Sequence, residues 1–300
     1  MSHRSTHTFQ ILVAIAALAA AGYAVYYDAH QRALRASVPP EAPHVSLAPD
    51  SLSALSAIIY DPSTGQVLFE KNAEMQLPLA SLTKLMTTDT ALSTMSPTTT
   101  VRITKEALRA DGSSGFKPGQ TWPLGKLIKY GLLVSSNDAM AAVAESGGGQ
   151  VFIDRMNAYA KEIGMTQSYF LNPSGLDLTS STAGAYGSAH DMALLASAVY
   201  KQYPSFLENT LRSNTDSFGK VVGLPTAAPL FDVPGLIGAK TGYTDLAGGN
   251  LVAVFDGTLG HPLVAVVLHS TEKGRFDDMK TLIAAARSDQ APSGQLAENK

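Results

Sequence analysis

Strand-forming segments lie near both ends of this 300-residue chain, and helix-forming segments fill the stretch between them. Residues 54–73 contain two apolar runs around Asp61-Pro62-Ser63-Thr64-Gly65, a hairpin pattern in which Gly65 can adopt a positive φ. Three more apolar runs near the end are typical of consecutive strands: residues 235–242, 249–257 and 261–270. A sheet built from both sets brings the two ends together, so we expect the residues between them to form a second, mostly helical lobe.

Apolar residues recur at helical spacing throughout the intervening stretch. We expect a helix from about Ser81 past Leu92, and further helices over residues 124–133, 137–144, 150–164, 188–203 and, at the end, 275–286. Ser188 and Asp191 have capping-box spacing, with Asp in place of the usual Glu. The sequence therefore predicts an α/β (α+β) fold with an antiparallel sheet flanked by helices, and a site in the cleft between the sheet and the helical lobe.

Composition narrows the function classes. Apolar residues make up 45% and charged residues 16%, which is typical of a globular chain. A formal net charge of −3, with no stripe of Lys and Arg, argues against nucleic acid as a partner. The absence of cysteine excludes disulfides and thiolate metal sites.

The N-terminal residues predict a targeting or membrane segment. Residues 11–27 carry no charge and would span about 25 Å as a helix, which suits a cleaved signal peptide or a retained anchor. Residues 36–50 are rich in Pro, Ala and Ser and resemble a tether. We therefore expect a signal or anchor segment at 1–35, a linker at 36–50, a catalytic domain at 51–287 and a polar tail at 288–300.

The stretch PLASLTKLMTT, residues 78–88, places the hydroxyl of Ser81 and the amine of Lys84 one turn apart at an expected helix start. Serine needs an adjacent base to act as a nucleophile, and a neutral lysine can be that base. The free N–H groups at a helix start can also hold an oxyanion. The spacing alone is not diagnostic, because it recurs outside helix starts at Ser114/Lys117, Ser217/Lys220 and Ser270/Lys273. For Ser81 taken by itself, a role as an ordinary helix N-cap remains an alternative.

Two further motifs change that interpretation. Ser135-Ser136-Asn137 is the only S-x-N of the chain and lies between two apolar helical stretches, while Lys240-Thr241-Gly242 is the only K-T-G and ends an expected strand. Taken singly, the first could be a helix cap and the second a solvated strand end. In the order S-x-x-K, S-x-N, K-T-G they form the signature set of penicillin-binding proteins and serine β-lactamases.

The chain resembles the D-alanyl-D-alanine carboxypeptidases of the low-molecular-mass penicillin-binding type. The similarity runs from AIIYDPSTGQVLFEKNA through SNDA, FLNPSGL and AKTGYTDLAGGNLVA to RFDD, over roughly residues 50–287. It implies a β-lactamase/transpeptidase-like fold. The chain departs from the family at Ser136, where members often have Gly. It also leaves no room for a β-rich C-terminal domain, and its polar tail has no amphipathic helix, so we expect any membrane attachment to rest on the N-terminal segment.

The resemblance implies a role for each motif residue. Ser81 would attack the carbonyl of the penultimate D-alanine, Lys84 would take its proton, and Ser135 would relay a proton to the leaving amine. Substrate-binding residues would be Asn137, Lys240, Thr241 and Gly242. Lys240 and Thr241 would face the cleft and bind the terminal carboxylate, and Gly242 would let substrate lie close to the backbone. The N–H groups of Ser81 and Tyr243 would form the oxyanion hole.

The resemblance also implies partners and a location. The substrate would be a peptidoglycan stem peptide ending in D-Ala-D-Ala, β-lactams would acylate the enzyme, and no metal or cofactor is implied. Such a substrate implies an enzyme outside the cytoplasm. The N-terminal segment would export the protein across the cytoplasmic membrane or anchor it there. A D,D-endopeptidase, a β-lactamase-like hydrolase and a non-catalytic binder of wall peptides or penicillin remain alternatives. For Asn172, Pro173 and Gly175 we favour a turn over catalysis, for His190 a first-turn helix residue, and for Trp122 packing.

Overall fold

The computed structural model describes residues 22–28, 30, 44–112, 114–211, 225–258 and 261–289. The chain divides into two units, Met1–Pro43 and His44–Lys300. Residues 22–28 are helical, and no helix among the described residues is both long and apolar enough to cross a membrane. Most of the predicted apolar segment at 11–27, much of the linker at 36–50 and most of the tail at 288–300 lie outside the described residues.

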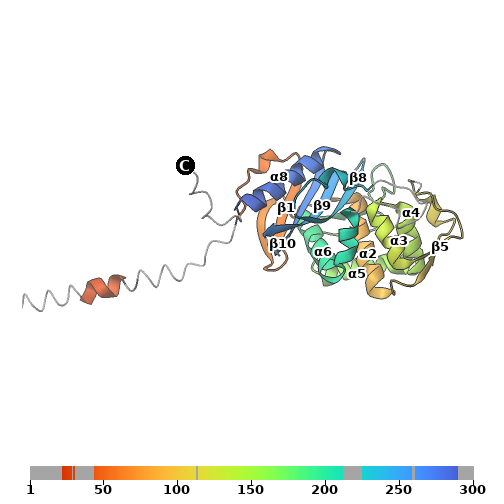
Figure 1. The fold of residues 1–300 in the computed structure, drawn as a ribbon, viewed down its shortest axis with the longest axis horizontal. Helices are drawn as coiled ribbons and strands as arrows, with labels where there is room; N and C mark the ends of the chain where they lie inside the picture. Colours follow the sequence, from red (N-terminus) through yellow and green to blue (C-terminus); the bar gives the residue numbers. More distant parts are fainter. Residues whose placement is uncertain are drawn as a thin grey trace, which may run out of the picture. The chain divides into compact units, whose positions relative to one another are not determined.

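A five-stranded antiparallel sheet forms one half of the second unit (Figure 1), with the strand order β2-β1-β10-β9-β8. Its strands are β1 (Ser56–Asp61), β2 (Gln66–Lys71), β8 (Leu236–Thr244), β9 (Gly248–Thr258) and β10 (His261–Ser270). Strand β1 pairs with β10, with Ile58 opposite Val266, so the N-terminal hairpin joins the C-terminal strands in one sheet. The prediction that the two ends share a sheet is confirmed. So is the hairpin turn, where Gly65 has a φ of 75°.

The two faces of the sheet are buried against different partners. Alternate residues such as Ile58, Val264 and Val266 belong to the core shared with the helical lobe. Their neighbours Ile59 and Val267 pack in the core beneath α8 (Gly274–Asp289), which covers the opposite face (Figure 1). Because successive side chains of a strand point to opposite faces, a sheet covered on both sides needs apolar residues at nearly every position. This explains the continuous apolar runs in the sequence.

The helical lobe consists of α2 (Thr83–Thr94), α3 (Leu124–Leu133), α4 (Asn137–Ser146), α5 (Gln150–Glu162), α6 (Ala189–Gln202) and α7 (Pro204–Glu208). Apart from the short α7, which was not predicted, these helices confirm the predicted ones, with ends that shift by one or two residues. The first helix starts later than predicted, because Ser81 lies in a 3₁₀ turn, η2 (Ala80–Leu82), ahead of the α-helix. Two small sheets were not predicted: β3 (Leu77–Pro78), β7 (Ala185–Gly187) and β6 (Tyr169–Phe170) form one, and β4 (Thr100–Arg102) and β5 (Thr121–Pro123) form the other. Short 3₁₀ turns complete the lobe and its surroundings: η1 (Pro49–Ser51), η3 (Ala107–Arg109), η4 (Asn209–Leu211) and η6 (Ala228–Leu230).

The cap of α6 is only half of the predicted capping box. The hydroxyl of Ser188 accepts the N–H of Asp191 at 3.0 Å, as expected. The carboxylate of Asp191 instead accepts the N–H of Gln167 at 2.8 Å and the hydroxyl of Ser168 at 2.7 Å. The acidic residue therefore ties the approach to β6 onto α6.

Candidate active site

Ser81 lies where the helical lobe meets the edge strand β8. A Cβ atom on Gly242 of β8 would come within 2.9 Å of the Leu79 carbonyl oxygen and 3.2 Å of the Ser81 nitrogen, so only glycine allows this approach. Two non-glycine residues of the site have positive φ angles, Ala80 at 48° and Ser135 at 59°. Such backbone strain tends to be retained at functional sites.

Lys84 is fully buried, and three oxygen atoms surround its amine. Nζ lies 2.6 Å from Oγ of Ser81, 2.7 Å from Oδ1 of Asn137 and 2.9 Å from the carbonyl oxygen of Ser174. Burial, and after it the charge of Lys240, hold the pKa of Lys84 well below its usual value. The structure thus brings Ser81, Lys84 and Asn137 together as the sequence predicted.

The lowered pKa favours a neutral amine, and the three contacts can accommodate one. Carbonyl and amide oxygens only accept hydrogen bonds, whereas a hydroxyl can also donate. A neutral amine has two N–H groups, which suit Asn137 and Ser174, and one lone pair, which can accept the O–H of Ser81. The arrangement gives the serine proton a basic acceptor.

The third contact of Lys84 comes from the FLNPSGL segment, which the sequence assigned to a turn. Oδ1 of Asn172 accepts the N–H groups of Ser174 at 3.1 Å and Gly175 at 2.7 Å, which makes the turn. Gly175 has a φ of 79°, and a Cβ atom there would overlap the carbonyl of Ala80. The prediction of a turn is confirmed. The carbonyl of Ser174 was not predicted, because a backbone oxygen has no residue signature.

Lys240 is also fully buried and belongs to the strand side of the site. Its amine donates to Oγ of Ser135 at 2.9 Å and to the carbonyl of Thr241 at 2.6 Å. Burial, and after it the charge of Arg275, lower the pKa of Lys240 to about 7. The side chains of Lys240 and Thr241 are both buried, and the Lys240 amine is directed at Ser135, another of the predicted site residues.

Arg275 of α8 is a further residue that the motif analysis missed. Its Nη1 donates to the carbonyl of Gly242 at 2.6 Å, and its side chain is 9% exposed. It thus places a cation behind the K-T-G strand. Its place at the start of RFDD, far along the chain from the three motifs, gave no indication of this contact.

The remaining predicted residues have simpler surroundings. Asn137 donates from Nδ2 to the carbonyl of Asp111 at 2.6 Å, and the side chain of Tyr243 is 45% exposed. His190 is in the first turn of α6 and contacts Glu74, and Trp122 packs edge-on against Phe116, as predicted.

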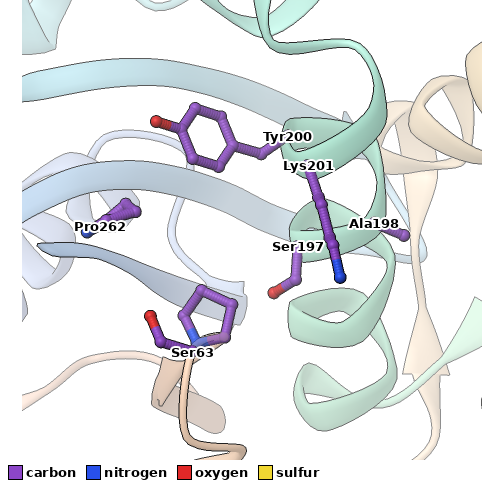
Figure 2. Close-up of a pocket in the computed structure, with 7 residues that line it drawn as sticks. Ser63, Ser197, Ala198, Tyr200, Lys201 and Pro262 are labelled. Atoms are coloured by element: carbon purple, nitrogen blue, oxygen red, sulfur yellow. The ribbon is translucent and has the colours of Figure 1, made fainter.

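No motif residue lines the hollow of about 410 Å³ between the β1–β2 turn, α6 and β10 (Figure 2), whose walls include Ser63, Ser197, Tyr200, Lys201 and Pro262. Within the described part of the chain, no group of three or more His, Asp or Glu side chains is placed to hold a metal ion.

Comparison with known proteins identifies the family. The D-alanyl-D-alanine carboxypeptidase family, peptidase S11, matches residues 43–272. The chain belongs to this family. The match includes all three motifs and the FLNPSGL turn.

Relatives and solved structures agree. The chain is 34% identical over 204 residues to D-alanyl-D-alanine carboxypeptidase DacF of Bacillus subtilis, covering 64% of this chain and 51% of the relative. It is 33% identical over 248 residues to DacA of Escherichia coli, covering 77% and 60%. The chain thus spans about half to three fifths of the length of these relatives.

Two solved structures are similar over nearly their whole length. The D-alanyl-D-alanine carboxypeptidase of Mycobacterium tuberculosis has a TM-score of 0.72 and 27% identity, covering 82% of this chain and 95% of that one. Penicillin-binding protein D2 of Listeria monocytogenes, in its ampicillin-bound form, has a TM-score of 0.70 and 29% identity, covering 80% and 98%. The predicted β-lactamase/transpeptidase-like fold is confirmed.

Proposed function

We propose that this protein is a serine-type D-alanyl-D-alanine carboxypeptidase that removes the terminal D-alanine from peptidoglycan stem peptides, and that β-lactams acylate it. The observation that carries the proposal is the buried amine of Lys84, 2.6 Å from the hydroxyl of Ser81 and with its pKa held well below the usual value. Family membership and the β-lactam complex of a similar structure support it.

Acylation begins with transfer of the Ser81 proton to the neutral amine of Lys84. Oγ then attacks the carbonyl carbon of the penultimate D-alanine and forms a tetrahedral oxyanion. The N–H groups of Ser81 and Tyr243 stabilise that oxyanion, because Gly242 brings β8 against the backbone around Ser81. Asn137 keeps the Lys84 amine in place and hydrogen-bonds the substrate backbone.

Collapse of the intermediate breaks the peptide bond. The leaving nitrogen receives the proton that Lys84 took from Ser81, relayed through the hydroxyl of Ser135, which the amine of Lys240 contacts at 2.9 Å. Lys240 and Thr241 supply the attraction for the terminal carboxylate, and an arriving carboxylate raises the pKa of Lys240 from about 7 and so keeps its amine charged. Free D-alanine leaves, and Ser81 carries the acyl group.

Deacylation repeats the proton transfer with water. Lys84, neutral again once it has passed its proton on, takes a proton from a water molecule that attacks the ester. The products are the shortened peptide carboxylate and free Ser81. A β-lactam follows the first step, but its leaving nitrogen stays attached to the acyl group, and the acyl-enzyme persists.

We place this reaction outside the cytoplasmic membrane, where stem peptides occur, with the protein exported or anchored by the N-terminal segment. The uncharged run at 11–27 and the Pro-rich residues 36–50 support this location. Fractionation of cells that express the full chain, beside a chain without residues 1–35, tests it. Recovery of the full chain in the cytoplasm contradicts the location.

Intact-mass spectrometry tests the activity. The protein is incubated with benzylpenicillin and, separately, with a peptide ending in D-Ala-D-Ala, beside a Ser81→Ala variant as control. We expect a stable penicilloyl adduct on Ser81 and release of one D-alanine from the peptide, both absent in the variant. Without an adduct or D-alanine release, the protein is a binder at most.

The same samples separate the rival enzymes. Rapid loss of the penicilloyl adduct with turnover indicates a β-lactamase, while cleavage of a cross-linked dimer in preference to the free peptide indicates an endopeptidase.

A further inference from the structure

Two residues between η3 and β5 are fastened to the start of α4, beside the candidate active site. The amide nitrogen of Asn137 donates to the carbonyl of Asp111 at 2.6 Å. The backbone N–H of Ser114 donates to the carboxylate of Asp138 at 3.1 Å, and its hydroxyl donates to that of Ser136 at 2.5 Å. The residues that follow Ser135 therefore share one hydrogen-bond network with Asp111 and Ser114.

Ser136 is at the centre of this network. Its side chain is 3% exposed. Oγ accepts the N–H of Ala139 at 3.1 Å, which caps α4, and the hydroxyl of Ser114. A helix cap needs only the first of these bonds. The second adds nothing to the helix and instead fixes the chain around Ser114.

The neighbours of Ser136 both contact a buried lysine. Ser135, on one side, accepts from Lys240, and its φ of 59° shows that it is held in an uncommon conformation. Asn137, on the other side, contacts Lys84 through its amide oxygen and Asp111 through its amide nitrogen. If Asp111 moves away, the amide loses its second anchor and can rotate away from Lys84.

We propose that Ser136 is a positioning residue for acylation: by tying Ser114 to the start of α4, its hydroxyl holds the Asn137 amide on Lys84 and the Ser135 hydroxyl on Lys240. This inference rests on the proposed function. The buried hydroxyl pair of Ser114 and Ser136 limits the orientations of both functional side chains.

The matched variants separate the tie from the cap. Ser114→Ala removes the hydroxyl bond to Ser136 and leaves the bond from Ala139 to Ser136 and the backbone bond from Ser114 to Asp138, whereas Ser136→Ala removes both bonds of the Ser136 hydroxyl. Ser136→Thr and Ser114→Thr keep the hydroxyls. Ser197→Ala is the control, because its hydroxyl bonds a helix carbonyl at 2.6 Å in the hollow of Figure 2, away from the motifs.

The rate constant for acylation by a fluorescent penicillin is measured over a range of concentrations, beside the melting temperature. We expect Ser114→Ala to lower the limiting rate about three- to tenfold, the effect of one lost neutral hydrogen bond, with the half-saturating concentration and the melting temperature little changed. The limiting rate of Ser136→Ala should fall by the same factor, and its melting temperature should fall as well. At least one threonine variant should restore the rate.

A wild-type limiting rate in Ser114→Ala overturns the inference and leaves Ser136 as a helix cap, whatever the stability of Ser136→Ala. An equal loss of rate in Ser197→Ala overturns it too, since the effect is then not local. If the wild-type protein forms no adduct, the proposed function itself fails, which is a distinct outcome from a wild-type rate in Ser114→Ala.

Discussion

The helical side and the strand side of the site each bury a lysine, but they surround it differently. Lys84, on α2, has two oxygens that only accept hydrogen bonds and one hydroxyl, and burial lowers its pKa well below the usual range. Lys240, on β8, contacts a hydroxyl and a carbonyl, and its pKa falls to about 7. In the proposed mechanism the amine on the helical side is the base. The strand side holds an amine that can be charged when an anion arrives.

The difference follows from where each lysine lies in the fold. Lys84 is enclosed because the Ser174 turn closes over α2, with Gly175 against the carbonyl of Ala80. Lys240 is on an edge strand, with Arg275 behind it and Ser135 in front. Burial is the largest cause of both lowered pKa values, so the two amines differ mainly in the groups that surround them.

The largest effect should come from Lys84→Arg. Arginine keeps the positive charge but does not deprotonate in the usable pH range, so the variant should bind penicillin yet acylate about 10²–10⁴ times more slowly, the usual contribution of a general base. Stopped-flow acylation measures this, with Lys280→Arg on the surface as control. A near-normal rate would show that the helical side supplies no base.

A smaller effect is expected for Lys240→Ala. Loss of a charge-assisted contact costs about 1.5–3 kcal/mol, or about 10–150-fold, and should fall on substrates with a free C-terminal carboxylate. The ratio of kcat/KM for a D-Ala-D-Ala peptide to that of its C-terminal amide should therefore drop. An unchanged ratio with a lower kcat for both substrates would show that Lys240 acts through Ser135 and does not bind the carboxylate.

The smallest effect is expected for Arg275→Gln, which removes the cation behind β8 and keeps an amide donor. Because Arg275 is the second cause of the lowered Lys240 pKa, after burial, the pKa of Lys240 should rise above about 7 in the variant. Lys240 would then stay charged to higher pH. The wild-type preference for a free carboxylate should fall above about pH 7, and in the variant this fall should occur at a higher pH. Arg287→Gln, on the same helix, is the control. Equal pH profiles for wild type and Arg275→Gln would show that the arginine does not influence the strand side.

Much of this site could be predicted because its chemistry is carried by side chains in ordered motifs. Ser81, Lys84 and Asn137 converge and Ser135 meets Lys240, as the motif order indicated, and α3 has the bounds expected from its apolar spacing. The sheet followed from the continuous apolar runs, which only burial on both faces explains.

The features that were not predicted depend on backbone atoms and on contacts between residues far apart in the sequence. The Ser174 carbonyl has no sequence signature, and the contact of Arg275 with Gly242 joins residues 33 positions apart. The direction of the Lys240 side chain depends on which face of β8 meets Ser135. That in turn follows from the strand register, with Lys240 opposite Val252, which the motif alone does not give.

The central claim is that Lys84 is neutral in the free enzyme at working pH. Heteronuclear NMR of protein labelled with ¹³C in its lysines tests it most directly, with the Lys84 signal assigned from its absence in Lys84→Arg. Since a lysine with a lowered pKa is neutral above that pKa, the Cε resonance of Lys84 should reach the shift of a neutral amine well below about pH 10.4, the usual pKa of a lysine side chain. A Lys84 resonance that stays in the ammonium position up to pH 10 would contradict the account.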